Sequence, residues 1–379
     1  MLDDEEDLEA DDNEDDYDET SLRFQMFANR VRWAPASKDG SRWDQRDSKA
    51  AVKVQRMLST CGQVALSTDA PLPPIFATKR LGEGRFGDVV LGETEDGKQS
   101  YAVKIALRPS SELAREASIL HAMRDEPYFP ELFYHQSVQL SETHDEMLVM
   151  ELLGSSLQRV WETTTTSTRL DARSVLRVGH GIIRALQSLH MRGWVHNDIK
   201  PGNILLGAEG TSRERELYLV DFGMATRRHD ELDGLASDRA VPSAAARVGS
   251  HLYASLTAHE GRPTRPVDDM ESLVYVLCFL ATGRLPWQGE RREHVAQLKR
   301  RMRKDGCSSM GEGSEASREL QALWSAVSAW SDDPSDSEAA VHERYAACLA
   351  ICGQDINIVE SETEDTRDGL DLFQHLASK

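Results

Sequence analysis

The stretch that decides the fold is His196-Asn197-Asp198-Ile199-Lys200-Pro201-Gly202-Asn203, which precedes two apolar, strand-like residues. Asp198 and Asn203 stand five positions apart. A carboxylate there can accept the proton of an attacking hydroxyl, while an amide oxygen holds a metal ion beside phosphate groups. Lys200 adds a positive charge near the transferred group. The pattern indicates phosphoryl transfer, and a polar loop with accidental spacing is the alternative that the other motifs must exclude.

Composition limits the classes of protein that the chain can be. It has 379 residues, 40% of them hydrophobic, and a formal net charge of -20. Residues 1–20 hold 13 acidic residues and no basic one, so the other 359 residues carry only -7. The acidic segment cannot bury enough apolar area to fold, so we expect it to be disordered, and it does not open like a secretory signal. With so ordinary a charge elsewhere, we expect no nucleic-acid partner.

Apolar runs and cysteines predict a protein outside the membrane. The longest apolar run, residues 273–281, has nine residues, far fewer than the about 20 that span a bilayer. The cysteines are odd in number and scattered, which predicts thiols in a reducing compartment rather than disulfides or a zinc site. We therefore expect a cytoplasmic or nuclear protein. The cysteines are Cys61, Cys278, Cys307, Cys348 and Cys352.

The two ends of the chain lie outside the predicted domain. Residues 21–75 are a linker or N-terminal extension of unknown role, and a proline cluster at 69–74 is typical of an extended boundary segment. A helix around residues 50–58 that docks on the domain and a tail of mixed composition are equal alternatives. Residues 356–379 are expected to form an acidic, frayed tail.

A glycine-rich pattern follows the proline cluster. Gly82, Gly84, Gly87 and Val89 make up G-x-G-x-x-G-x-V, and a predicted strand, Tyr101-Ala102-Val103-Lys104-Ile105, follows. Glycines let the backbone approach phosphates closely. Two strands around a glycine turn form a hairpin, unlike the strand-to-helix turn of a dinucleotide site, and without G-K-[ST] the pattern is not a P-loop. An ordinary hairpin is the alternative, but the Ala-x-Lys strand favours nucleotide binding.

Lys104 lies in an apolar strand, where an unpaired charge is costly to bury. The next predicted helix takes Ser110 or Ser111 as its N-cap and contains two acidic candidates for a partner. We predict that Glu116 pairs with Lys104, which would then hold the α- and β-phosphates of a nucleotide. Glu112, one turn earlier, is the competing candidate, and a solvent-facing helix position is the alternative role for Glu116.

Two strand-like segments end at candidate nucleotide contacts. Residues 146–154 run from an apolar strand into a glycine, which we interpret as a hinge with Met150 at the back of an adenine pocket. Residues 217–220 precede Asp-Phe-Gly, whose Asp221 is a carboxylate placed to bind magnesium between phosphates. In this order along the chain, the motifs support one another.

Two segments are predicted to be core helices. Apolar residues recur at helical spacing over residues 171–192 and stop at a glycine, and we expect His180 and His190 to be helix residues without a chemical role. Residues 266–283 open with acidic residues, continue as the apolar run and end at a glycine. A helix that is apolar all round should be buried centrally, and Asp269 near its start could support the catalytic loop through hydrogen bonds.

Together these segments resemble the eukaryotic protein kinases, and among them the casein kinase I group. The likeness covers about residues 76–355 and implies an α+β, two-lobed protein-kinase fold. A small antiparallel-sheet N-lobe would occupy about residues 76–150 and a mostly helical C-lobe about residues 151–355. Beside the stretch quoted first, the likeness lies in Met150-Glu151-Leu152-Leu153-Gly154, Gly249-Ser250-His251-Leu252-Tyr253-Ala254-Ser255, Asp268-Asp269-Met270-Glu271-Ser272 and Leu285-Pro286-Trp287-Gln288-Gly289.

The resemblance also implies the chemistry. ATP and Mg²⁺ would be the cofactors, and the γ-phosphoryl group would pass to Ser or Thr of a protein. Asp198, Lys200 and Asn203 would be catalytic, with Asp198 as the base, and Asn203 and Asp221 would bind the metal. The residues implied to bind ATP are Leu81, Gly82, Gly84, Gly87, Val89, Ala102, Lys104, Glu116, Met150, Glu151, Leu153 and Leu205.

Departures from the family pattern concern regulation and substrate. Asn197 replaces the arginine that usually precedes the catalytic aspartate, so an activation-segment phosphate would lack that partner and is not the expected switch. Ala254-Ser255-Leu256 stands where most kinases have A-P-E, as in the casein kinase I group. The casein kinase I group recognises acidic or already phosphorylated substrates through a basic cluster. None of the candidate basic residues of this chain aligns with that cluster, so its substrate preference stays open. The candidates are Arg227, Arg228, Arg239, Arg247, Arg291 and Arg292.

We expect an active protein kinase that acts on protein substrates as a monomer. Two other functions compete with this prediction. A pseudokinase scaffold would bind partners through the same lobes, and a small-molecule kinase would use the same fold. Every catalytic residue type is present, and the long helical C-lobe favours a protein substrate. Residues 1–20 could occupy an anion-reading substrate site and inhibit the enzyme, or serve as a solubilising or partner-binding tail.

Overall fold

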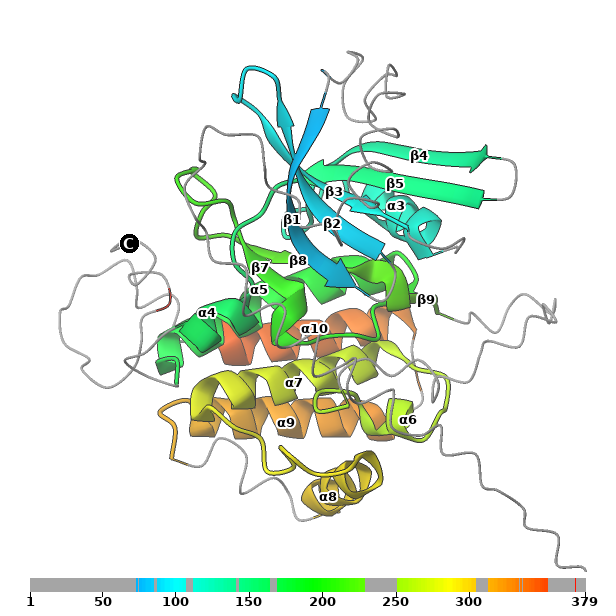
Figure 1. The fold of residues 1–379 in the computed structure, drawn as a ribbon. Helices are drawn as coiled ribbons and strands as arrows, with labels where there is room; N and C mark the ends of the chain where they lie inside the picture. Colours follow the sequence, from blue (N-terminus) through cyan, green and yellow to red (C-terminus); the bar gives the residue numbers. More distant parts are fainter. Residues whose placement is uncertain are drawn as a thin grey trace, which may run out of the picture.

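The protein has a sheet lobe and a helical lobe, which Figure 1 shows for the computed structural model. Several sequence predictions fall on residues that the structure does not describe. They include the disorder of residues 1–20, the helix around residues 50–58, the N-cap at Ser110 or Ser111 and the candidate basic residues Arg239 and Arg247. The described residues are 73, 75–84, 87–106, 112–140, 143–163, 169–228, 251–304, 313–333, 335, 337–353 and 372.

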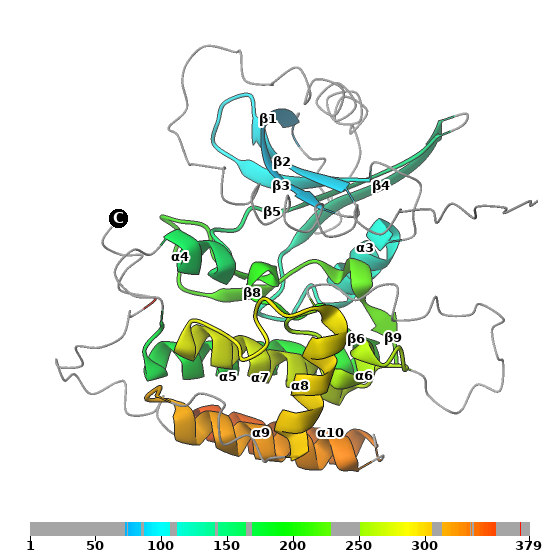
Figure 2. The same cartoon turned by 60° about the horizontal axis from the view of Figure 1, so that its bottom comes forward.

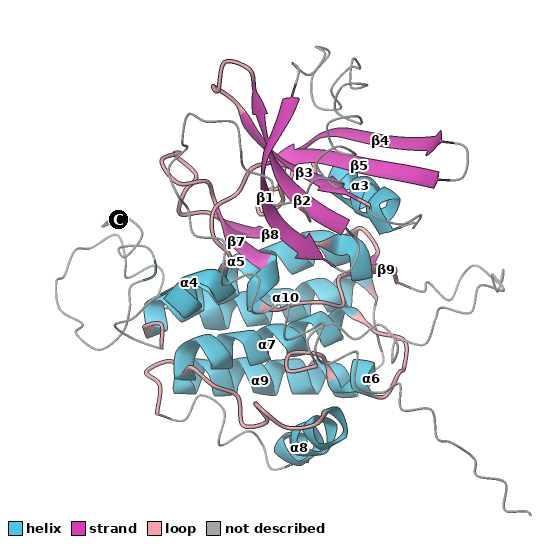
Figure 3. Ribbon diagram, in the orientation of Figure 1, coloured by secondary structure: helices cyan, strands magenta, loops and turns pink. Residues whose placement is uncertain are grey.

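The sheet lobe is a five-stranded antiparallel sheet in the order β1-β2-β3-β5-β4 (Figure 3). Its elements are β1 Ile75–Gly84, β2 Gly87–Thr94, β3 Ser100–Ile105, α3 Glu112–Ala122, β4 Leu132–Leu140 and β5 Thr143–Glu151. Val103 and Ile105 of β3 join a small buried cluster on one face. Because side chains alternate along a strand, Lys104 points to the other face. On that face Leu148 and Met150 join the larger core together with residues of α3.

The helical lobe is built on four helices that pack side by side. Helix α7 lies against α5 and α9, and α10 contacts both α5 and α9 (Figures 1 and 2). The short strands pair as β6 with β9 and β7 with β8. The elements are α4 Leu157–Thr163, α5 Ala172–Met191, β6 Trp194–Val195, η1 Pro201–Asn203, β7 Ile204–Leu206, β8 Leu217–Leu219, η2 Phe222–Met224, β9 Thr226–Arg227, α6 Leu256–His259, α7 Pro266–Thr282, α8 Arg292–Lys304, α9 Ser317–Asp332 and α10 Glu338–Gly353.

Helix α7 is the buried centre of this lobe, as the sequence predicts. Every residue from Pro266 to Ala281 is buried. Pro266 stands in the first turn, where its missing N–H has no partner to lose. Gly283 ends the helix in the left-handed region, with φ 78°. The acidic residues in the first turn are therefore carried into the core, where they need polar partners.

Helix α5 confirms the predicted core helix at 171–192. Asp171 is its N-cap, and its Oδ1 accepts a hydrogen bond from the Ser174 backbone N–H at 2.6 Å. Gly193 follows the last turn with φ 77°. The predicted fold class, a small antiparallel sheet lobe joined to a mostly helical lobe, is confirmed as well, whereas the division of the chain into domains and tails stays a prediction.

The C-terminal prediction differs at one position. Leu372 is fully buried, and its backbone N–H donates to Ser174 Oγ at 3.1 Å, so this residue is part of the core rather than of a frayed tail. The rest of residues 356–379 lie outside the described residues. Of the cysteines, Cys278, Cys348 and Cys352 are described, as buried thiols. No helix in the described ranges is long and apolar enough to cross a membrane.

Candidate active site

The predicted catalytic residues come together in the loop between β6 and β7. Asp198 is 8% exposed, and its Oδ2 accepts hydrogen bonds from Lys200 Nζ at 2.6 Å and from Asn203 Nδ2 at 3.1 Å. Asn203 Nδ2 also donates to the Asp198 carbonyl at 2.9 Å, which closes the loop on itself. Burial lowers the pKa of Lys200, but the charges of Asp198 and Asp221 outweigh it and raise that pKa above its ordinary value. Lys200 is therefore a cation beside the Asp198 carboxylate.

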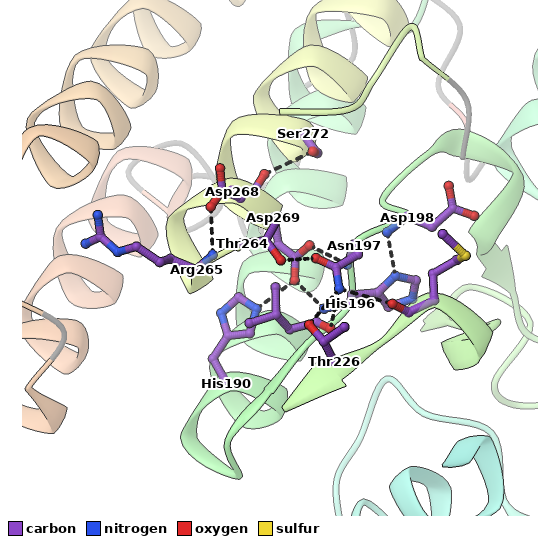
Figure 4. Close-up of polar contacts among 12 residues, drawn as sticks. His190, His196, Asn197, Asp198, Thr226, Thr264, Arg265, Asp268, Asp269 and Ser272 are labelled. Carbon is purple, nitrogen blue, oxygen red and sulfur yellow. Dashed lines mark hydrogen bonds and ion pairs between the residues drawn. The ribbon is translucent and has the colours of Figure 1, made fainter. Parts of the chain in front are cut away.

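Asp269 supports this loop from the first turn of α7, as Figure 4 shows. Its Oδ2 accepts from the His196 N–H at 2.6 Å and its Oδ1 from the Asn197 N–H at 2.8 Å. The predicted support by Asp269 is thus confirmed. His190 Nε2 lies 2.8 Å from the same Oδ2, and its Nδ1 contacts the Tyr345 hydroxyl. His190 lies in a helix, as predicted, and its ring has polar partners that helical spacing cannot reveal. That it has no chemical role stays a prediction.

Lys104 is held between two carboxylates, one from each lobe. Its Nζ lies 2.6 Å from Glu116 Oε2 on α3 and 2.9 Å from Asp221 Oδ1 after β8. The predicted pairing with Glu116 is confirmed, and the competing Glu112 has a buried Oε2 without a hydrogen-bond partner among the described residues. Burial lowers the pKa of Lys104, but the charges of Asp221 and Glu116 raise it above its ordinary value.

Asp221 is an ionised carboxylate in a strained backbone position. Burial opposes its charge, but Lys104 and Lys200 lower the pKa of Asp221 to about 2. Its φ of 66° lies in the left-handed region, which few residues other than glycine adopt without cost. Arg115 of α3 fixes the next turn, since its Nη1 donates to the Gly223 carbonyl at 3.0 Å. Arg115 was not predicted, because it gives no signal in the sequence beyond its place on the same helix as Glu116.

The glycine-rich hairpin packs closely against the protein's own backbone at one of its glycines, and the approach of the other glycines to phosphates stays a prediction. A Cβ on Gly87 would lie 1.9 Å from the Ile105 carbonyl oxygen, so no larger residue fits there. At Gly82 a Cβ would meet nothing within 4 Å, which leaves open space beside β1. Across the β2–β3 pair, Val89 lies opposite Lys104. The open backbone at Gly82 thus lies in β1, which β2 separates from the cationic Lys104 in β3.

The predicted hinge residues lie at the junction of the lobes. Met150 lies opposite Ala102 in the β3–β5 pair, and Leu205 pairs with the segment after the hinge through an isolated bridge. The Glu151 carboxylate accepts a hydrogen bond from Tyr218 at 3.2 Å, so a ligand would have to meet Glu151 through its backbone. The other predicted ATP-binding residues are Leu81, Gly82 and Gly84 in β1 and Leu153 after β5.

The segment that replaces A-P-E is anchored by two helices. Glu271 of α7 accepts a hydrogen bond from the Leu256 backbone N–H at 2.8 Å. Lys299 of α8 is 1% exposed, and its Nζ donates to the carbonyls of His251 at 3.1 Å and Ala254 at 2.6 Å. Burial lowers the pKa of Lys299 to about 7. Lys299 was not predicted, although it stands in helical register with the apolar positions of its own helix.

Comparison with known proteins shows which family the chain belongs to. The chain belongs to the protein kinase domain family, whose model matches residues 76–336. Within it the chain is casein kinase I-like. It is 34% identical over 229 residues to casein kinase 1-like protein HD16 of Oryza sativa subsp. japonica, covering 57% of this chain and 31% of that protein.

Two further relatives agree. A probable casein kinase I homolog of Encephalitozoon cuniculi is 30% identical over 216 residues, covering 57% of this chain and 68% of that protein. Casein kinase I homolog 3 of Schizosaccharomyces pombe is 32% identical over 213 residues, covering 56% of this chain and 47% of that protein. The likeness thus spans less than a third of the rice protein and about half of the fission yeast protein.

Proposed function

We propose that this chain is an ATP- and Mg²⁺-dependent serine/threonine protein kinase that transfers the γ-phosphoryl group to protein hydroxyls. One observation carries the proposal. The Asp198 carboxylate is held by Lys200 and Asn203, while Lys104 is held between Glu116 and Asp221. Phosphoryl transfer depends mainly on positioning and on charge stabilisation, and these groups supply both.

The donor set suits magnesium. Across the described ranges, no group of three or more His, Cys, Asp or Glu side chains gathers as a metal cage. Asn203 and Asp221 offer oxygen ligands, and Asp221, with a pKa of about 2 and a side chain 33% exposed, is charged and accessible. Magnesium is usually held by one or two carboxylates together with substrate phosphates. When bound, it would neutralise charge on the phosphates, with Asn203 and Asp221 as its protein ligands.

Each remaining residue has a role that its position supports. Asp198 would accept the proton of the substrate hydroxyl, since its Oδ2 is a hydrogen-bond acceptor held in a fixed place. Lys200 would neutralise charge on the transferred group. Lys104, aligned by Glu116, would hold the α- and β-phosphates under Gly82, Gly84 and Gly87. The adenine would lie between the β3 and hinge residues, with Leu205 below, by analogy with the family.

The two competing functions find less support. A pseudokinase scaffold would not need the hydrogen bond that holds Asn203 to Asp198 together with an ionised Asp221 beside Lys104. A small-molecule kinase would share the fold, but the casein kinase I-like relatives favour a protein substrate. We further infer protein substrates that include acidic or phosphorylated ones, a monomeric enzyme and a cytoplasmic or nuclear location.

The test is radiolabelled phosphate transfer from ATP and Mg²⁺ to casein by the full chain. Asp198→Ala should lower the rate roughly 100- to 10,000-fold, the contribution of a general base. The matched control is Asp125→Ala, whose side chain is 87% exposed and which should keep the wild-type rate. Transfer that survives in Asp198→Ala would contradict the proposed role of the base. Absence of transfer from the wild type with intact nucleotide binding would favour the scaffold.

A further inference from the structure

Asn197 makes side-chain contacts that the catalytic loop does not require for its own closure. Its φ is 68°, a left-handed conformation that Asn tolerates better than most residues. Its Nδ2 lies 3.0 Å from the Met224 carbonyl and 2.9 Å from Thr226 Oγ1. Thr264 Oγ1 donates to its Oδ1 at 2.5 Å. In Figure 4 the Asn197 amide stands between Thr226 and Thr264.

The hydrogen-bond network fixes which end of the amide is which. Carbonyl oxygens only accept, and both the Met224 carbonyl and the Val195 carbonyl, the latter at 3.3 Å, lie on the Nδ2 side. The NH₂ group must therefore face them, because an oxygen placed there would meet two acceptors. Thr264 can then donate to Oδ1, while Thr226 accepts from Nδ2. The amide uses both of its donors and its acceptor.

These contacts tie together three segments that act in the proposed reaction. Asn197 immediately precedes Asp198 in the chain. Met224 and Thr226 follow Asp221, the proposed metal ligand, and Thr226 begins β9. Thr264 belongs to the turn before α7, whose Asp269 accepts the Asn197 backbone N–H at 2.8 Å. One side chain thus connects the base, the segment after the metal ligand and the supporting helix.

We propose that Asn197 is a positioning residue. Its uncharged side chain holds the catalytic loop against the segment after Asp221 without a phosphate, through the hydrogen bonds to Met224, Thr226 and Thr264 that we call the clasp. This inference rests on the proposed kinase function. In kinases with arginine at this position, the cation is available to an activation-segment phosphate. An amide carries no charge for a phosphate to neutralise, and the donors and acceptor of Asn197 are already matched by neutral partners. The side chain thus joins the catalytic loop to the segment after Asp221 with no phosphate among its partners.

The test compares variants that remove the clasp and leave the backbone conformation free to form. Asn197→Gly keeps the left-handed conformation at no steric cost and removes the amide. Asn197→Asp keeps the shape but turns both donors into acceptors that face carbonyls. Thr226→Val removes one partner. The matched control is Thr282→Val, at the far end of α7, whose hydroxyl also bonds backbone carbonyls, at 2.7 Å each.

The kinetic measurements are kcat and KM for ATP, before and after phosphatase treatment of each variant of the 379-residue chain. The structural measurement is backbone hydrogen exchange. We expect Asn197→Gly and Asn197→Asp to lower kcat about 10- to 100-fold, as loss of alignment does, with KM for ATP within about threefold. Thr226→Val should have a smaller effect in the same direction, and Thr282→Val should lose stability but keep kcat. Phosphatase-treated wild type should keep its full kcat.

The outcomes distinguish the failure of the proposed role of Asn197 from the failure of the kinase proposal. A wild-type kcat in Asn197→Gly, or loss of wild-type activity on phosphatase treatment, overturns the clasp while leaving the kinase proposal intact. If the wild type transfers no phosphate, the kinase proposal fails by itself, and hydrogen exchange then decides on the clasp. Residues 224–228 should exchange faster in Asn197→Gly than in Thr282→Val, and equal protection in both proteins would refute it.

Discussion

Replacing Asp269 by Asn should both destabilise the domain and slow its reaction. Asp269 is 1% exposed and accepts the N–H groups of His196 and Asn197, with His190 Nε2 at 2.8 Å. An asparagine keeps the shape but turns one oxygen into a donor. In either orientation at least one buried backbone N–H then faces another donor and loses its acceptor.

The magnitude follows from that single loss. A hydrogen bond to a charged acceptor contributes about 1.5–3 kcal/mol, and a buried donor left without a partner costs about 1–3 kcal/mol. We therefore expect Asp269→Asn to lower the free energy of unfolding by about 2.5–6 kcal/mol, or the Tm by roughly 5–24 °C for a domain of this size. The kcat should fall about 10- to 100-fold, because His196 and Asn197 lead directly to Asp198.

The neighbouring Asp268→Asn is the matched control. Asp268 is 4% exposed on the same turn, and its Oδ2 accepts the Arg265 backbone N–H at 2.7 Å. Its other partners are the hydroxyls of Thr257 and Ser255, which can accept as well as donate. Asparagine can keep the acceptor for the Arg265 N–H and removes a charge that burial disfavours, so the loss at pH 7 should be below about 1 kcal/mol. Urea unfolding and steady-state kinetics measure both variants. Equal stability of Asp269→Asn and wild type would refute the reasoning, as would an equal loss in the two variants.

Two other predictions concern the charged groups of the site. Glu116→Gln should raise KM for ATP about tenfold or more, because Lys104 loses one of its two carboxylates, while Glu112→Gln changes it less than about twofold in the same transfer assay. Burial and the charge of Glu271 raise the pKa of Asp268 from 3.8 to about 6. The folded protein then binds this proton more tightly than the unfolded chain, so the free energy of unfolding falls as pH rises from about 4 to about 6, by roughly 3 kcal/mol at most. Unfolding of Asp268→Asn against pH should lack that decline, and an unchanged slope would contradict the assignment.

What the sequence could predict was local or periodic. Asp198 and Asn203 lie in one short loop, so their meeting needed no long-range information. The α7 helix was predictable because an apolar run with a proline at one end and a glycine at the other allows few alternatives. Glu116 was predictable because Lys104 had to find a carboxylate nearby, and the next helix supplied it.

What the sequence could not predict depends on partners far along the chain. Lys299 lies in a strongly basic helix, where its charge looked like that of its exposed neighbours Arg300 and Arg301. Its signal was the register, since Val295 and Met302 are buried at spacings of four and three from it. Register predicts burial, but the carbonyl groups that it meets, 45 and 48 positions earlier, are set by the tertiary fold alone.

Two departures from the usual kinase pattern, Asn197 and the segment that replaces A-P-E, are supported by the same helix, α7. Asp269 of α7 holds the backbone around Asn197, and Glu271, two residues later, accepts the Leu256 N–H in the segment that replaces A-P-E. The Tyr275 hydroxyl donates to the same Glu271 oxygen at 2.7 Å, and Lys299 lies 4.6 Å from the centre of the Tyr275 ring. Because α7 is buried from Pro266 to Ala281, its first turn cannot move without disturbing the core. Both the catalytic loop and the end of the activation segment are therefore fixed to one rigid element, so substitutions at Asp269 and at Glu271 should impair the loop and the segment end separately while destabilising the same core.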